Sequence, residues 1–99
     1  MSNREDLIFL DNARVASIVL EADEESPWHY HSELVEYVIC LNGTIDLQTN
    51  EPKRSIKLQP AKHYKINPMQ VHRLVNTGQN IATYLLVQNG NYDFISSNS

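Results

Sequence analysis

The stretch that decides the fold is residues 28–43, which read WHYHSELVEYVICLNG. His29 and His31 stand two positions apart in an extended segment, so their side chains should lie on one face, about 7 Å apart along the strand. Glu36 follows after a short bend, near the start of an apolar run over Val35–Leu41 that predicts a strand. The stretch therefore predicts two short extended segments that deliver two imidazoles and one carboxylate to the same side.

The dipeptide Asn42-Gly43 ends this run and predicts a tight turn, because both residues tolerate positive φ. A turn of this kind between two apolar segments is the strongest short-range signal for a β-hairpin. In Thr44–Thr49, apolar and β-branched residues alternate with polar ones. We therefore expect Thr44–Thr49 to pair with the strand over Val35–Leu41 as a hairpin.

The rest of the chain repeats this pattern of short strands and turns. Apolar or alternating runs end at Asn, Asp, Gly or Pro, and no segment has the period of a helix. About nine strands, with turns every eight to twelve residues or so, predict an all-β sandwich or barrel. The other expected strands are Leu7–Leu10, Val15–Ala22, Ser55–Leu58, His63–Ile66, Val71–Val75 and Ile81–Gln88, followed by an edge piece at Tyr92–Ile95 and a frayed tail at Ser96–Ser99.

His72 completes a set of side chains that could bind a metal ion. It lies in the expected strand over Val71–Val75, which could pair across a barrel from the first two histidines. Imidazole nitrogens and carboxylate oxygens hold divalent ions at about 2.1 Å, and this donor set suits Zn, Fe, Ni, Mn or Cu. We expect one divalent transition-metal ion bound by His29, His31, Glu36 and His72. The alternative is a barrel that has lost its metal and kept these polar residues inside.

The spacing of the first three ligands resembles the first motif of the cupin superfamily, Gly-x5-His-x-His-x4-Glu-x6-Gly. The chain matches every specified position from His29 to Gly43, and Asp23 takes the place of the opening glycine.

The second cupin motif, Gly-x5-Pro-x-Gly-x2-His-x3-Asn, is matched at His72 and Asn76. Three other positions differ, with Ala61, Asn67 and Met69 in place of Gly, Pro and Gly, which affects the expected turn shapes and leaves the ligands unchanged. The resemblance extends from about residue 15 to residue 84.

The resemblance implies an all-β double-stranded β-helix, or jelly roll, as a single cupin domain over residues 1–99 with a core of about 7–95. It also implies a metal inside the barrel and a homodimer. Cupins include dioxygenases, isomerases and lyases as well as non-enzymatic storage and sensor domains, so the fold does not fix one reaction. We expect a metal-dependent enzyme that acts on a small organic molecule. The alternative is a non-catalytic metal-binding, ligand-binding or sensing module.

Composition argues against several other classes of partner. Lys and Arg number 8 against 12 for Asp and Glu, a formal net charge of −4 that offers no attraction for nucleic acid. No apolar stretch approaches the length of a membrane span, and the polar start Met1–Asp6 lacks the core of a signal peptide. The cytoplasm is the expected location.

Cys40, the single cysteine, is expected to be a buried thiol.

Alternation along the strands predicts what surrounds the ligands. If Glu36 faces inward, Val38 and Cys40 follow it, while Tyr37 points the other way. The same rule turns Trp28 and Tyr30 away from the metal.

On the strand of His72, alternation turns Gln70 and Leu74 inward and Arg73 outward, which leaves a pocket of metal and apolar wall without an anion clamp. His63 fits no motif position and is expected to have a surface or structural role, and Glu33 is expected to be a solvated charge. Tyr64 and Tyr84 could either line the pocket or pack the barrel.

Overall fold

The computed structural model describes residues 3–98, and this part of the chain is built from strands without a helix. No helix there could cross a membrane. The all-β expectation is confirmed. The strands are β1 (Asn3–Phe9), β2 (Ala13–Leu20), β3 (His29–Tyr30), β4 (Leu34–Asn42), β5 (Ile45–Thr49), β6 (Arg54–Leu58), β7 (His63–Ile66), β8 (His72–Val75), β9 (Ala82–Gly90) and β10 (Ile95–Ser96).

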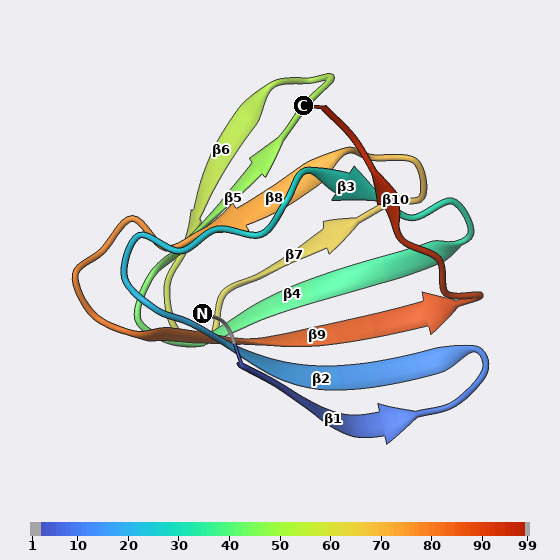
Figure 1. Cartoon of the computed structure of the whole chain (residues 1–99), viewed down its shortest axis with the longest axis horizontal. Coiled ribbons are helices and arrows are strands. Elements are labelled where there is room, and N and C mark those ends of the chain that lie inside the picture. The colour runs from blue at the N-terminus through green and yellow to red at the C-terminus, as the bar shows by residue number, and fades with distance from the viewer. Residues whose placement is uncertain (1–2, 99) are drawn as a thin grey trace.

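These strands form two five-stranded sheets that face one another (Figure 1). The first sheet has the order β1-β2-β9-β4-β7 and the second the order β10-β3-β8-β5-β6. Neighbouring strands are antiparallel throughout. Because most neighbours are distant in sequence, the chain crosses repeatedly between the sheets, as expected for a jelly roll.

The core lies between the two sheets and follows the period-2 alternation of each strand. In β4, β5 and β9 buried side chains alternate with half-buried ones, so each strand turns one face to the other sheet. Burial of this apolar surface stabilises the fold, at about 25 cal/mol per Å². The central cluster contains Ile18, Leu20, Val38, Cys40, Ile45, Leu47, Leu58, Ile66, Leu74, Ala82, Tyr84 and Leu86.

The predicted hairpin at Asn42-Gly43 is wrong. Strand β4 belongs to the first sheet and β5 to the second, so the turn carries the chain from one sheet to the other. Gly43 has a φ of 77°, and a Cβ there would lie 2.9 Å from the Cβ of Ala82. This crossing uses a positive φ at Gly43, as a hairpin turn would, so the dipeptide alone does not distinguish a crossing between sheets from a hairpin.

Both ends of the described chain contain more strand than the sequence predicted. Strand β1 starts at Asn3 and forms an edge of the first sheet, and its apolar residues Leu7, Ile8 and Phe9 are exposed. At the other end, Ser96 belongs to β10 and pairs with His29, although the tail was expected to be frayed. Met1, Ser2 and Ser99 lie outside the described residues.

The turns that carry glycine in the cupin motifs keep their shape here without it. Asp23, Ala61 and Met69 have φ values of 61°, 74° and 69°. This left-handed region disfavours residues that carry a Cβ, by about 1–2 kcal/mol each. The backbone therefore adopts the conformation for which the motif uses glycine, and the substituted residues bear the strain.

Candidate metal centre

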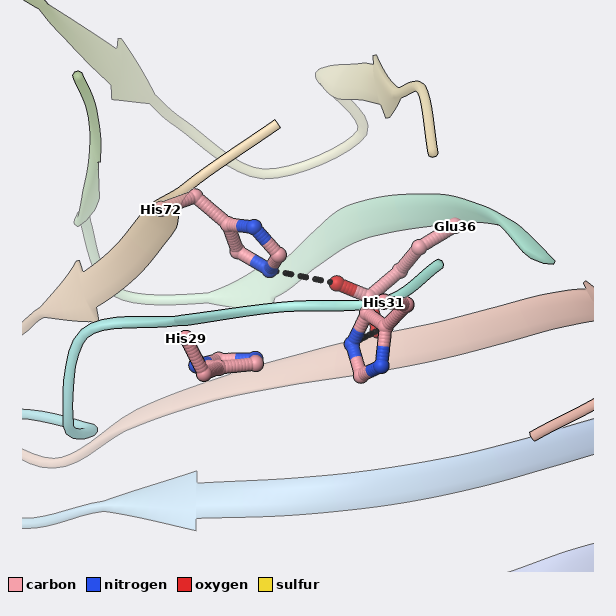
Figure 2. Close-up of side chains that lie close together, drawn as sticks. All are labelled: His29, His31, Glu36 and His72. Carbon is pink, nitrogen blue, oxygen red and sulfur yellow. Dashed lines mark hydrogen bonds and ion pairs between the residues drawn. The ribbon is translucent and has the colours of Figure 1, made fainter. Parts of the chain in front are cut away.

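The four predicted ligands come together between the sheets (Figure 2). His29 in β3 and His72 in β8 are direct cross-strand partners in the second sheet, and their ring centroids lie 4.3 Å apart. Glu36 reaches the same point from β4 in the first sheet, and His31 from the residue after β3. All four are buried, and one ligand atom from each lies within 4.8 Å of the others.

Main-chain carbonyls orient all three imidazoles in the same way. The Nδ1 atom of His29 lies 2.8 Å from the Pro27 oxygen, and that of His72 lies 2.8 Å from the Gln70 oxygen. The Nδ1 of His31 is 2.5 Å from the oxygen of Asp93. Because a carbonyl only accepts, each Nδ1 carries the proton and donates it. Each Nε2 is therefore the ring nitrogen that faces the group, and in its unprotonated form it can bind a metal ion.

The Glu36 carboxylate occupies the centre of the group. Its Oε2 lies 3.0 Å from Nε2 of His72, and its Oε1 lies 3.5 Å from Nε2 of His31 (Figure 2). Within residues 3–98, the buried Nε2 of His31 has no hydrogen-bond partner. Burial acts to raise the pKa of Glu36, but the adjacent side chains of His31 and His72 outweigh burial and hold the pKa well below its usual range. The carboxylate is thus ionised and available as a ligand.

The two histidines on either side of Tyr30 differ electrostatically. Burial, together with the nearby imidazole of His72, lowers the pKa of His29 to about 4, so that this ring is neutral near pH 7. Burial also acts to lower the pKa of His31, but the adjacent Glu36 carboxylate, with its negative charge, outweighs burial and raises the pKa. A metal ion would take the place of the proton that Glu36 favours on His31.

Gln88, which the sequence analysis missed, holds the ligand carboxylate. It lies opposite Glu36 in the pairing of β9 with β4, and its Nε2 donates a 2.7 Å hydrogen bond to Oε1 of Glu36. Gln88 lies on the same face of β9 as the buried Tyr84 and Leu86, because the three are spaced two residues apart. This alternation was the sequence signal that Gln88 faces inward. The partner strand could not be read from the sequence.

The segment after β9 covers the site, and its role was also missed. Besides the carbonyl that binds His31, Asp93 places its carboxylate against the backbone N–H and hydroxyl of Ser32. These two bonds lower the pKa of Asp93. The ring of Phe94 stacks on His29, with centroids 4.3 Å apart and planes 12° from parallel. In Figure 1 this segment runs from the end of β9 to β10, beside β3.

A cavity of about 230 Å³ opens beside the ligands. Its walls include the expected apolar residues but also polar side chains that the sequence analysis did not place there. The lining residues are Arg4, Ile18, Leu20, Glu25, Ser26, Pro27, His29, His31, Glu36, Leu74, Tyr84, Leu86, Gln88, Tyr92 and Phe94. The expectation of a purely apolar wall is therefore wrong, because β1 contributes Arg4, the loop between β2 and β3 contributes Glu25 and Ser26, and β9 contributes Gln88.

The other neighbours largely follow the predicted alternation. Val38 and Cys40 are buried with Glu36, whereas Tyr37 is half-buried on the other face. Arg73 points away from the cavity, donates to Gln48 and lies over the ring of Trp28.

His63, expected at the surface or in a structural role, and Glu33, expected to be solvated, are both exposed. Asn76, the last residue of the second motif, is buried and donates to the carbonyls of Leu20, Glu21 and Asn80, so its role is structural.

Comparison with known proteins identifies the family. The family model for the cupin domain matches residues 16–88, and the chain therefore belongs to the cupin family. A search of curated protein sequences finds no significant match.

Solved structures show the same fold. One similar structure is a conserved protein with a double-stranded β-helix domain from Klebsiella pneumoniae, with a TM-score of 0.88 and 17% identity over 99% of this chain and 85% of that one. An oxalate oxidase has a TM-score of 0.83 at 15% identity, over 96% of this chain and 54% of that one, so this chain spans about half of that enzyme. The polyketide cyclase RemF from Streptomyces resistomycificus has a TM-score of 0.82 and 17% identity, over 96% of this chain and 70% of that one. At these identities the similarity concerns the fold alone.

Proposed function

We propose that the chain is a metal-dependent enzyme that acts on a small organic molecule, with one divalent transition-metal ion held by His29, His31, Glu36 and His72. The observation that carries this proposal is the shared orientation of the three histidines. Each Nδ1–H is fixed on a main-chain carbonyl, and the Nε2 of His31 and of His72 lies against Glu36. Carbonyl partners of this kind are the usual support of histidine ligands to a metal.

The donor set fits such an ion. Three neutral imidazoles and one carboxylate suit Zn, Fe, Ni, Mn or Cu, and an octahedral ion would keep two positions for substrate or water. When bound, the ion supplies a Lewis acid that polarises a carbonyl or carboxylate, or a redox centre if it is iron or copper.

The chain's own residues would do the remaining work at this site. Gln88 keeps one oxygen of Glu36 engaged, and Phe94 packs on the ring of His29. The cavity is smaller than the roughly 300–1,000 Å³ of sites for drug-sized molecules, which favours a small metabolite. Reactions of the dioxygenase, isomerase or lyase type meet these constraints. Two proteins of similar fold, the oxalate oxidase and the polyketide cyclase, are enzymes by name.

Metal analysis tests the proposal directly. Tag-free protein should contain about one equivalent of a transition metal after reconstitution, and the double variant His29→Ala/His31→Ala should contain none. His63→Ala is the matched control, because His63 is exposed on β7, outside the group. The absence of bound metal in the wild-type protein after reconstitution would overturn the proposal.

A non-catalytic role is the second candidate, and the position of the ligands favours it. Glu36 belongs to the first sheet and His29 and His72 to the second, so a bound ion would link the two sheets. Binding to the folded state alone would raise its stability. A metal that raises the melting temperature while no turnover is found with carboxylate, carbonyl or hydroxy-acid substrates would favour this second role.

A further inference from the structure

Arg4, whose side chain is 39% exposed, and Tyr84 are two of the polar residues that line the cavity away from the candidate metal group. Arg4 of β1 pairs with Ile18 of β2, which in turn pairs with Tyr84 of β9, so the three form one row across the first sheet. Ile18 and Tyr84 are buried, which places Arg4 on the same inner face. Tyr84 lies four residues before Gln88 on β9, about 13 Å along the strand. Arg4 and Tyr84 line the same cavity as His29, His31 and Glu36.

The Tyr84 hydroxyl is available to a ligand. Tyr84 is only 3% exposed, and it lines the cavity. A phenol hydroxyl can donate a hydrogen bond, so it can bind an acceptor group that enters the cavity. Burial and the negative charge of Glu36 raise the pKa of Tyr84, while Arg4 lowers it. The phenol therefore stays protonated and remains a donor.

Arg4 is the arginine of the cavity lining. Its Nε donates to Oδ1 of Asp6 at 3.0 Å, a bond that leaves both η nitrogens for other partners. The two acidic residues of the lining have cationic or imidazole partners, since Glu25 pairs with Arg73 and Glu36 with His31 and His72. An anion near Arg4 and Tyr84 would therefore meet two donors.

We propose that Arg4 and Tyr84 bind a carboxylate of the substrate, so that the substrate is a small acid whose carboxylate lies remote from the group that meets the metal. The planar guanidinium matches a carboxylate in geometry. A phosphate, with nearly two negative charges, would need more cation than one arginine already paired to an aspartate provides. This inference rests on the proposed function, because the other end of the molecule meets the metal ion.

The test uses cobalt(II)-loaded protein, whose visible spectrum reports a ligand that reaches the metal. Acetate can reach only the metal end, whereas succinate, glutarate and adipate offer a second carboxylate at increasing distance. We expect at least one of these dicarboxylates to bind the wild-type protein about tenfold or more tightly than acetate, since charge-assisted hydrogen bonds are among the stronger ones.

Two variants separate the contributions. Arg4→Gln should remove most of this preference and leave acetate binding unchanged, and Tyr84→Phe should reduce it by severalfold. Arg54→Gln is the matched control, because Arg54 is exposed on β6 and does not line this cavity. Melting temperatures confirm that each variant is folded.

The outcomes are distinguishable. If the wild-type protein binds cobalt but no dicarboxylate exceeds acetate, or if the preference persists in Arg4→Gln, the inference is overturned and Arg4 serves only its ion pair with Asp6. A preference that Tyr84→Phe leaves intact overturns the part assigned to Tyr84. If the wild-type protein fails to bind cobalt, the proposed metal centre itself fails.

Discussion

Gln88 donates a hydrogen bond of 2.7 Å from its amide nitrogen to Oε1 of Glu36, across the pairing of β9 with β4. An ionised carboxylate only accepts hydrogen bonds, so this contact fixes which end of the amide faces Glu36. The same contact leaves the other oxygen, Oε2, facing His72. The side chain that positions the Glu36 carboxylate thus comes from a strand that supplies none of the four candidate metal ligands.

Replacement of Gln88 by Leu should weaken metal binding while the fold is kept. Loss of a hydrogen bond that orients a ligand typically costs about 10- to 100-fold in metal affinity. Competition with a chromophoric chelator would measure the change. Gln59→Leu is the control, since Gln59 is exposed and lies outside the site. Equal affinities in the two variants would show that Gln88 does not position Glu36.

Replacement of Asp93 by Ala should also weaken metal binding. The carboxylate of Asp93 anchors the segment to Ser32, and the carbonyl of the same residue accepts the Nδ1–H of His31. A looser segment would leave His31 free to turn, and we expect an affinity loss of about tenfold. The same chelator competition applies, with Asp11→Ala, an exposed aspartate before β2, as the control. Unchanged affinity in Asp93→Ala would contradict the role of this segment.

Ala61→Gly should stabilise the protein. Ala61 is exposed and has a φ of 74°, a conformation in which glycine is not strained. We expect an increase of about 0.5–1 kcal/mol in the free energy of unfolding. Ala22 is the control, because it is an exposed turn residue whose φ is not positive. Ala22→Gly should lower the free energy of unfolding by about 0.4–1 kcal/mol. Denaturant titration measures both, and a change of the same sign in both variants would rule out relief of strain.

Gly43→Ala should destabilise the crossing between the sheets. The new Cβ would lie 2.9 Å from the Cβ of Ala82 at a φ of 77°, so the variant combines a clash with backbone strain. We expect a loss of about 2 kcal/mol or more in the free energy of unfolding. Gly78→Ala is the control, because Gly78 has no positive φ and its nearest contact is Asn76 Oδ1 at 3.3 Å. Similar losses in both variants would argue against the special role of Gly43.

The sequence predicted the fold class and the convergence of the four ligand side chains. Alternation places every second residue of a strand on the same face. Once Glu36 was assumed to face inward, the inward direction of Val38 and Cys40 followed, and all three are buried. The sequence did not reveal which strands pair. The Asn42-Gly43 signal was read as a hairpin because positive φ is a local property, whereas the choice between turn and crossing depends on the whole barrel.

The same limit explains the residues that were missed around the site. Gln88, Asp93 and Phe94 act on ligands that lie about fifty or more positions earlier in the chain. Such contacts arise from pairings between β9 and β4 and between β10 and β3. Arg4 was missed as a lining residue because β1 was expected to begin only at Leu7.

The position of Asp93 and Phe94 has a practical consequence for anyone who trims or transplants this domain. The family match ends at residue 88, before either of them. A fragment cut at residues 16–88 would contain all four ligands, but His31 would lack its carbonyl partner and His29 its stacked ring. A metal site grafted from this chain onto another barrel should therefore include the segment with Asp93 and Phe94, together with the histidines.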